Sequence, residues 1–205
     1  MTGTAARKII LASGSQSRRQ MLAAAGLVFE AVPSRVDERA IRDALEGDSG
    51  AVDPMDLAEI LARAKAEDVS RDYPQALVIG ADQVLALDDR IYEKPKNLAE
   101  ARAHIWSFRG RTHALHSSVA LAVAGETGWT HTDTATLTMR TFSTAFADMY
   151  VDRAGPVICQ SVGAYQLEGL GIQLFERIEG DYFTILGLPL LALLDELRNR
   201  EVMPT

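Results

Sequence analysis

The sequence contains a single cysteine, Cys159, among its 205 residues. One thiol cannot form a disulfide within the chain, and a zinc finger needs paired cysteines that are missing here. No uninterrupted apolar run is long enough to cross a bilayer, and residues 1–8 lack the apolar stretch of a secretory signal. These absences favour a cytoplasmic protein with no membrane partner.

An excess of positive charge is missing too. The 21 lysines and arginines are outnumbered by 28 acidic residues, which leaves a net charge of -7. A surface of this sign repels polyanions, so binding to bulk nucleic acid is disfavoured. A small anion is a different case, because a few well-placed cations and backbone amides suffice to bind it. The length fits one domain of two closely packed lobes, spanning residues 1–205.

Strand-like and helix-like patterns alternate along the chain. Apolar runs at residues 8–12, 27–32 and 76–79 predict buried strands, and strand character resumes at residues 84–87 after a predicted break at Asp82. β-branched residues predict a long hairpin of two strands, at residues 112–123 and 129–141. Helices are predicted at residues 18–25, 36–45 (closed by Gly47), 54–72, 97–108, 143–153 and 188–200. Such interleaving predicts a mixed α/β fold.

The first candidate site is the polar stretch at residues 13–19, between the first predicted strand and helix. It contains Ser13, Ser15 and Arg18. Backbone N–H groups at a helix N-terminus point toward an anion, hydroxyls add donors, and the guanidinium fork matches phosphate oxygens. The alternative is a serine-rich helix cap beside surface arginines, because serines are common at helix starts. The Walker phosphate-loop pattern is missing.

The second candidate is Asp82, a carboxylate in otherwise apolar surroundings. It could bind a divalent cation or act as a general base on water, and the alternative is a structural aspartate that caps a turn. Glu38 offers a further carboxylate, and Lys65 and Lys94 could balance phosphate charge. Each of these alone is usually a solvated surface charge.

A third candidate is the glycine-punctuated stretch at residues 163–171. Its glycines allow the backbone to approach a flat ligand closely, but a tight structural turn is the simpler interpretation. The four histidines have no metal-binding spacing, and His113 is the only one that is kept as a candidate. Cys159 is expected to be a small buried residue rather than a nucleophile.

Taken together, these segments resemble the Maf family of nucleoside triphosphate pyrophosphatases, over nearly the whole chain. Several motifs occur in order, which makes the likeness specific. They are Leu11-Ala12-Ser13-Gly14-Ser15 with Arg18, Val36-Asp37-Glu38, Ala64-Lys65-Ala66, Gly80-Ala81-Asp82, Glu93-Lys94-Pro95, Gly110-Arg111-Thr112-His113, and residues 176–182 with Gly187-Leu188-Pro189.

The resemblance implies a fold similar to the inosine-triphosphate pyrophosphatases, with a long mixed sheet, flanking helices and a central cleft between two lobes. It also implies a divalent metal, Mg²⁺ or Mn²⁺, held by Glu38 and Asp82, and a homodimer. By the family's pattern Ser13, Ser15 and Arg18 clamp phosphate. The implied catalytic residues are Asp82, Glu38, Lys65 and Lys94, and Asp82 accepts the proton.

The family's base preference depends on two positions, occupied here by Gln83 and Glu168. This pair resembles the branch acting on 7-methylguanosine triphosphate, whereas members acting on dTTP and UTP tend to have Thr and Gln. A glutamate carboxylate can accept both N1–H and N2–H of guanine. Ser17 stands where some 7-methylguanosine members carry an aromatic residue. A nucleotide-binding regulator of cell division is the alternative from another functional class.

Overall fold

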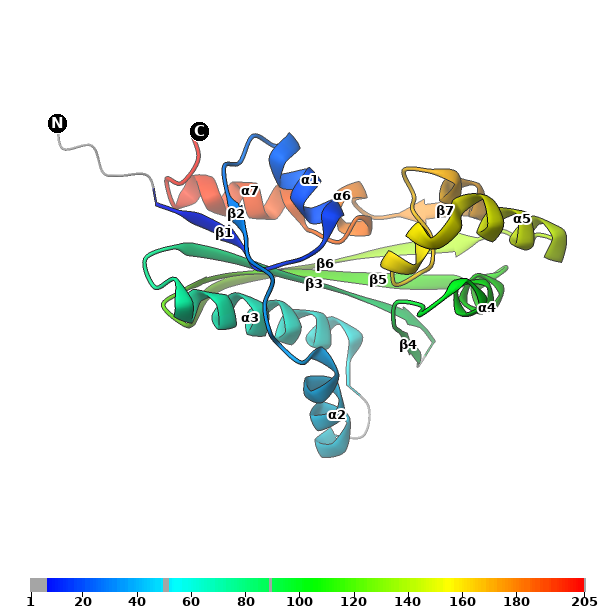
Figure 1. The fold of residues 1–205 in the computed structure, drawn as a ribbon, viewed down its shortest axis with the longest axis horizontal. Coiled ribbons are helices and arrows are strands. Elements are labelled where there is room, and N and C mark those ends of the chain that lie inside the picture. Colours follow the sequence, from blue (N-terminus) through cyan, green and yellow to red (C-terminus); the bar gives the residue numbers. More distant parts are fainter. Residues whose placement is uncertain (1–6, 50–51, 89, 205) are drawn as a thin grey trace.

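The computed structural model describes residues 7–49, 52–88 and 90–204. Within these residues, strands form one mixed sheet in the order β2-β1-β3-β5-β6-β7, and β4 pairs with part of β3 (Figure 1). The strands are β1 (Ile9–Leu11), β2 (Glu30–Ala31), β3 (Leu77–Leu87), β4 (Arg90–Tyr92), β5 (Thr112–Val123), β6 (Glu126–Met139) and β7 (Phe175–Glu179).

Helices cover both faces of this sheet (Figure 1). They are α1 (Gln16–Ala24), α2 (Glu38–Ser49), α3 (Pro54–Asp72), α4 (Leu98–Phe108), α5 (Thr144–Ala154), α6 (Tyr182–Ile185) and α7 (Leu190–Asn199), with short 3-10 helices at Gly155–Gln160 and Leu170–Leu174. The mixed α/β class expected from the sequence is confirmed. None of the described helices is both long and apolar enough to span a bilayer.

Helix α3 lies unusually close to the middle of the sheet because of Gly80. A Cβ atom at this position would lie 2.2 Å from the backbone oxygen of Ala62 and 2.7 Å from Cβ of Ala66. Both alanines are fully buried between α3 and the sheet. Gly80 therefore lets α3 approach the sheet closely enough for the side chain of Lys65 on α3 to reach Asp82 on β3.

The edge of β3 is uncovered at its centre. Strand β1 runs parallel to residues 77–79 of β3, and β4 pairs with residues 85–87. Between these two partners, no described strand pairs with that edge. The uncovered stretch contains Asp82. On the opposite edge of β3 this residue is still paired with Ser118 of β5.

Several local predictions need correction. Strand β3 is continuous from Leu77 to Leu87, so the predicted break at Asp82 is wrong. The carboxylate is tolerated within the strand because the ammonium of Lys65 pairs with it. Gly47 does not close α2, which continues to Ser49, since glycine in a helix lowers stability without forbidding the conformation. Helix α1 begins at Gln16 rather than residue 18, because Ser15 is the cap.

The hairpin and the second strand also differ in length from the prediction. Strands β5 and β6 are joined by only Ala124 and Gly125, both with positive φ, so β6 begins earlier than predicted. Strand β2 contains two residues instead of six. The helix predicted at residues 54–72 has those bounds, with the Asp53 side chain accepting from the N–H groups of Met55 and Asp56.

Candidate active site

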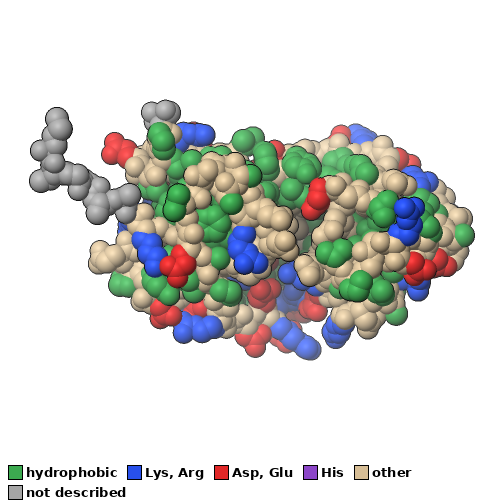
Figure 2. All heavy atoms as spheres, turned by 45° about the horizontal axis from the view of Figure 1, so that its top comes forward, with side chains coloured by type: hydrophobic (Ala, Val, Ile, Leu, Met, Phe, Trp, Pro, Cys, Tyr) green, Lys and Arg blue, Asp and Glu red, His purple; other side chains and the backbone are tan. Residues whose placement is uncertain are grey.

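A cleft of about 1150 Å³ opens at the uncovered edge of β3. All ten predicted site residues line it: Ser13, Ser15, Ser17, Arg18, Glu38, Lys65, Asp82, Gln83, Lys94 and Glu168. Figure 2 shows a hollow near the middle of the molecule where acidic and basic side chains crowd together. The structure thus brings together residues that are spread over most of the sequence.

The loop between β1 and α1 forms one wall of the cleft. Ser15 caps α1, and its hydroxyl oxygen accepts from the backbone N–H of Arg18 at 3.4 Å. The hydroxyl oxygen of Ser13 accepts from the N–H of Ser15 at 3.2 Å. Both serines use their oxygens as acceptors within the protein, so each keeps its own hydroxyl hydrogen for a ligand. The helix-cap interpretation and the anion-site interpretation therefore describe the same geometry.

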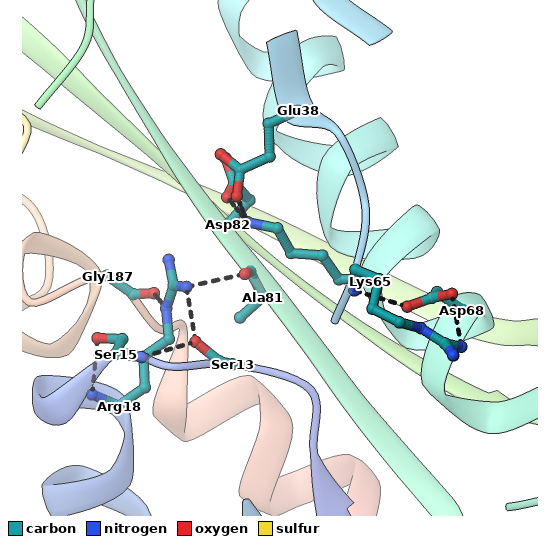
Figure 3. A network of polar contacts seen from close by, with 10 residues as sticks. Ser13, Ser15, Arg18, Glu38, Lys65, Asp68, Ala81, Asp82 and Gly187 are labelled. Carbon is teal, nitrogen blue, oxygen red and sulfur yellow. Dashed lines mark hydrogen bonds and ion pairs between the residues drawn. The ribbon is translucent and has the colours of Figure 1, made fainter. Parts of the chain in front are cut away.

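Arg18 is mostly engaged with the protein itself (Figure 3). Its Nε donates to the carbonyl of Gly187 at 2.8 Å, and Nη1 donates to the carbonyl of Ala81 at 2.8 Å and to Ser13 at 3.3 Å. Burial lowers the pKa of Arg18, while Asp82 and Glu38 oppose that shift. Only Nη2 has no hydrogen bond to the described residues. Arg18 thus fixes the position of the serine loop and keeps one nitrogen for a ligand.

Lys65 joins the two carboxylates of the site (Figure 3). Its Nζ lies 2.5 Å from Oδ1 of Asp82 on β3 and 2.6 Å from Oε1 of Glu38 at the start of α2. Lys65 lies on the face of α3 that Gly80 brings toward the sheet. The side chain of Asp82 is only 9% exposed, whereas that of Glu38 is 51% exposed. A carboxylate from the floor of the cleft and a carboxylate from its rim therefore meet at the same ammonium group.

The two carboxylates have pKa values displaced in opposite directions. Burial raises the pKa of Asp82, although Lys65 and Arg18 oppose this effect. Partial burial of Glu38 acts in the same direction, but the charges of Lys65, Lys94 and Arg18 outweigh it and lower its pKa. Displaced pairs of this kind are typical of sites where one group exchanges a proton and the other stays ionised.

Lys94 follows β4 and adds a further cation near the mouth of the cleft. Desolvation by the surrounding cleft lowers its pKa, and the nearby positive charge of Arg18 acts in the same direction. Its side chain remains exposed to solvent. It can therefore move toward an anionic ligand.

Gln83 and Asp82 are neighbours on β3 and so point to opposite faces of the sheet. Nε2 of Gln83 donates to Ser117 Oγ at 3.0 Å and to the carbonyls of Thr184 and Ile185 at 3.1 and 3.0 Å. Backbone carbonyls only accept, which fixes the orientation of the amide. The side-chain oxygen of Gln83 is therefore what this residue can offer to a ligand.

Two predicted substrate-binding residues have less defined roles. Glu168 is exposed on the opposite wall of the cleft, in the loop before the second 3-10 helix. Ser17 lies half-buried in the first turn of α1. Both line the cleft, and neither has a hydrogen bond of its side chain to the described residues. Their position is thus set by the backbone.

The donor set fits a divalent cation that is completed by a ligand. Within the described residues, no group of three or more His, Cys, Asp or Glu side chains could enclose a metal. Mg²⁺ is commonly held by one or two carboxylates together with substrate phosphates. Asp82 and Glu38 supply such a pair of carboxylates, because both already contact the positive charge of Lys65.

Sequence reasoning missed Arg42 and Ser117, and it named Gly187 only within a family motif, without a role at the site. Arg42 lines the cleft from α2 and pairs with Glu93, and its spacing of four residues from Glu38 on one helix could have indicated it. Ser117 lies opposite Gln83 in the register of β3 and β5, a pairing that no sequence pattern reveals. Gly187 supplies a carbonyl to Arg18 and adopts a φ of +98°.

The remaining candidates lie at or behind the cleft. Cys159 is half-buried and lines the cleft, so it is less enclosed than expected. His113 is buried behind the wall that carries Tyr165. Residues 163 and 165–168 of the glycine-punctuated stretch line that wall.

The fold and the cleft define an α/β enzyme that handles phosphorylated compounds. Hydroxyl donors at a helix N-terminus, two lysines and a pair of carboxylates with displaced pKa values converge on one space. The family model for Maf-like proteins matches residues 8–200. The chain therefore belongs to the Maf-like protein family.

Curated relatives agree with this assignment. The chain is 53% identical over 191 residues to the 7-methyl-GTP pyrophosphatase of Rhizobium meliloti (strain 1021), covering 93% of this chain and 95% of that protein. It is 50% identical over 196 residues to the nucleoside triphosphate pyrophosphatase of Paramagnetospirillum magneticum (strain ATCC 700264 / AMB-1), covering 95% and 100%. A dITP/XTP pyrophosphatase structure from Mycobacterium abscessus overlays with a TM-score of 0.41 at 16% identity, covering 95% of each chain.

Proposed function

We propose that this protein is a nucleoside triphosphate pyrophosphatase, which releases pyrophosphate and leaves the nucleoside monophosphate. The observation that carries the proposal is the Lys65 ammonium between Asp82 and Glu38, inside a cleft whose other wall is the serine loop. The relatives named pyrophosphatases support it, since they match nearly the whole chain.

The cleft residues bind the triphosphate by complementary charge and hydrogen bonds. The hydroxyls of Ser13 and Ser15 donate to phosphate oxygens, next to the N-terminus of α1 with its positive dipole end. Nη2 of Arg18 and the ammonium of Lys94 neutralise further negative charge. Phosphoryl transfer needs little covalent help from the protein, so positioning and electrostatics supply most of the catalysis.

Asp82 accepts the proton of the attacking water. Burial raises its pKa toward the working pH, which makes it a better base than an exposed aspartate. Lys65 holds its carboxylate in one orientation. The water oxygen attacks the α-phosphorus, the bond from that phosphorus to the bridging oxygen breaks, and the pyrophosphate departs with the electron pair.

Asp82 and Glu38 would also hold the divalent cation, Mg²⁺ or Mn²⁺. When bound, such an ion neutralises phosphate charge and polarises the P–O bonds. Glu38 suits this role because its lowered pKa keeps it ionised. Removing the cation with EDTA should abolish pyrophosphate release, and adding Mg²⁺ should restore it.

The preferred base is proposed to be a guanine, including 7-methylguanine. Gln83 offers an oxygen, because its nitrogen is engaged with backbone carbonyls, and Glu168 offers a carboxylate. Both are acceptors, and guanine presents two adjacent N–H donors to such groups. The alternative is a preference for dTTP and UTP, with the same release of pyrophosphate.

The test is a substrate panel of 7-methyl-GTP, GTP, UTP and dTTP with Mg²⁺, in which pyrophosphate and orthophosphate are measured separately. We expect pyrophosphate from at least one substrate, and its loss in Asp82→Asn. The matched control is Asp133→Asn, on β6 outside the cleft lining. Orthophosphate as the initial product, or full activity of Asp82→Asn, would refute the mechanism.

Base selection is tested separately with Glu168→Gln. This variant should lose preference for 7-methyl-GTP over UTP, because an amide cannot accept both guanine N–H groups. Glu176→Gln, an exposed residue of β7 outside the cleft lining, is the control. An unchanged ratio of kcat/KM values between the two substrates would remove Glu168 from base recognition.

A cytoplasmic location is part of the proposal and follows the expectation from the sequence. A homodimer is also part of it and rests on the family resemblance alone. Sedimentation velocity of the full chain should give a mass of twice 22.3 kDa. A monomer would contradict the oligomeric state without affecting the proposed chemistry.

A further inference from the structure

His113 is a buried polar side chain that the proposed chemistry does not use. It lies on β5, is 2% exposed and is not part of the cleft lining. Its Nε2 lies 2.8 Å from the hydroxyl of Tyr165, which does line the cleft. Its Nδ1 is buried with no hydrogen-bond partner in the part of the chain that the structure describes. The polar contact that His113 makes here is thus directed at the cleft wall.

Tyr165 is held in place from several sides. Its ring meets Phe175 edge-on, with centroids 4.9 Å apart. A Cβ atom on Gly163 would lie 2.1 Å from the same ring, so the ring fills the space that a side chain at position 163 would need. The His113 ring in turn packs on Phe108 at 4.9 Å. The hydrogen bond fixes the one polar end of an otherwise apolar, well-packed ring.

The backbone around Tyr165 forms a tight turn that depends on such support. Ala164 adopts a φ of +57°, a left-handed conformation that residues with side chains rarely occupy. Its carbonyl accepts from the hydroxyl of Tyr150 at 3.2 Å. Strained backbone persists only where the surroundings hold it. Two tyrosine hydroxyls therefore contribute to holding this turn.

The turn determines where the next residues lie. Gln166 accepts from the N–H of Gly169 at 3.2 Å, which closes the loop that carries Glu168. Glu168 has no hydrogen bond of its side chain to the described residues, so its carboxylate is placed by this backbone alone. A shift at Tyr165 moves Glu168 with it.

We propose that His113 is a positioning residue that acts through the Tyr165 hydroxyl to hold the cleft wall carrying Glu168, and so sets the affinity for the nucleotide's base. This inference rests on the proposed function. Burial lowers the pKa of His113 to about 4, so the imidazole stays neutral at pH 7 and can form the bond without a counter-charge. The phosphate loop lies on the other wall and Asp82 on the floor of the cleft, so the chemical step does not depend on the bond.

The experiment removes the hydrogen bond from either side. In Tyr165→Phe and His113→Leu we expect KM for 7-methyl-GTP to rise about tenfold, equivalent to about 1.4 kcal/mol, with kcat within about twofold of wild type. A KM effect without a kcat effect reports binding shared by ground state and transition state. His113→Gln can still donate to the tyrosine and should restore most of the affinity. The double variant Tyr165→Phe/His113→Leu should be no worse than either single variant.

His104→Leu is the matched control for loss of a buried histidine in the same aromatic cluster. His104 is 7% exposed, packs on Tyr92 and lies outside the cleft lining. It should lower the unfolding midpoint without changing KM. An equal KM effect in His104→Leu, or an unchanged KM in Tyr165→Phe, would overturn the inference and leave His113 a purely structural residue.

Binding of the α,β-methylene analogue of 7-methyl-GTP, measured by calorimetry, separates the two proposals. If wild type binds the analogue but releases no pyrophosphate from any nucleotide of the panel, the proposed function fails, and a Kd for the analogue raised about tenfold in Tyr165→Phe still supports the inference. If wild type hydrolyses the substrate and the Kd is the same in Tyr165→Phe, the inference fails alone. If wild type does not bind the analogue, the inference and the guanine preference fail, whereas pyrophosphate release from another nucleotide of the panel would still support the proposed reaction.

Discussion

Replacing Gly80 by alanine should separate α3 from the sheet and so displace Lys65 from Asp82. The new Cβ would lie 2.2 Å from the backbone oxygen of Ala62, whereas ordinary contact begins near 3.4 Å. Neither the strand nor the helix backbone can rotate away as a flexible side chain could. The helix must therefore move by about 1 Å.

The expected size follows from two opposing effects. Overpacking of this kind costs about 1–3 kcal/mol, and the backbone clash places Gly80→Ala at the upper end. Alanine recovers about 0.5–1 kcal/mol of the entropy that glycine loses on folding. The net loss is about 2 kcal/mol, or about 4–8 °C in Tm for a chain of this length. A misplacement of about 1 Å at the Lys65–Asp82 pair should lower kcat about 100-fold.

The assay combines thermal unfolding with pyrophosphate release from the best substrate of the panel. Gly47→Ala is the matched control, since nothing lies within 4 Å of a Cβ there and α2 continues through it. It should stabilise the protein by about 0.5–1 kcal/mol and leave kcat unchanged. A Gly80→Ala protein as stable and active as wild type would show that α3 does not approach the sheet as closely as described.

Three further perturbations test the electrostatics of the site and its surroundings. Lys65→Met leaves Asp82 buried without its partner, which should destabilise the protein by about 3 kcal/mol at pH 8. The loss should shrink as the pH falls, because burial raises the pKa of Asp82 and protonation removes the unpaired charge. Equal losses in denaturant melts at pH 8 and pH 5 would contradict the pairing. His113 has a folded pKa of about 4 against an ordinary value of 6.5, so the unfolded chain binds the proton first as pH falls. Wild type should thus lose about 3 kcal/mol more than His113→Gln between pH 6.5 and 4, and parallel stability curves would refute this. Arg18→Lys cannot reach the carbonyls of Ala81 and Gly187 together and should lower stability by about 2 kcal/mol, whereas unchanged stability would place Arg18 at the ligand alone.

The sequence by itself determined most of the helices and strands and indicated ten residues that the fold brings to one cleft. Period, caps and turn residues act over a few neighbouring residues, so the helix at residues 54–72 and the long hairpin could be read directly. The Maf-like motifs, together with the positions compared for base preference, supplied ten predicted site residues, and all ten line the cleft.

Only the tertiary structure decided how those residues work together. The apolar strand pattern stops before Asp82 and resumes after it, which predicts a break there, but Lys65 from a separate helix pairs with the carboxylate and the strand continues through it. The orientation of the Gln83 amide depends on Ser117 and on carbonyls about a hundred positions later in the chain. Contacts of this kind depend on strand register and on the close approach of α3 at Gly80. Both are set by the packing of the whole sheet, which no local pattern in the sequence records.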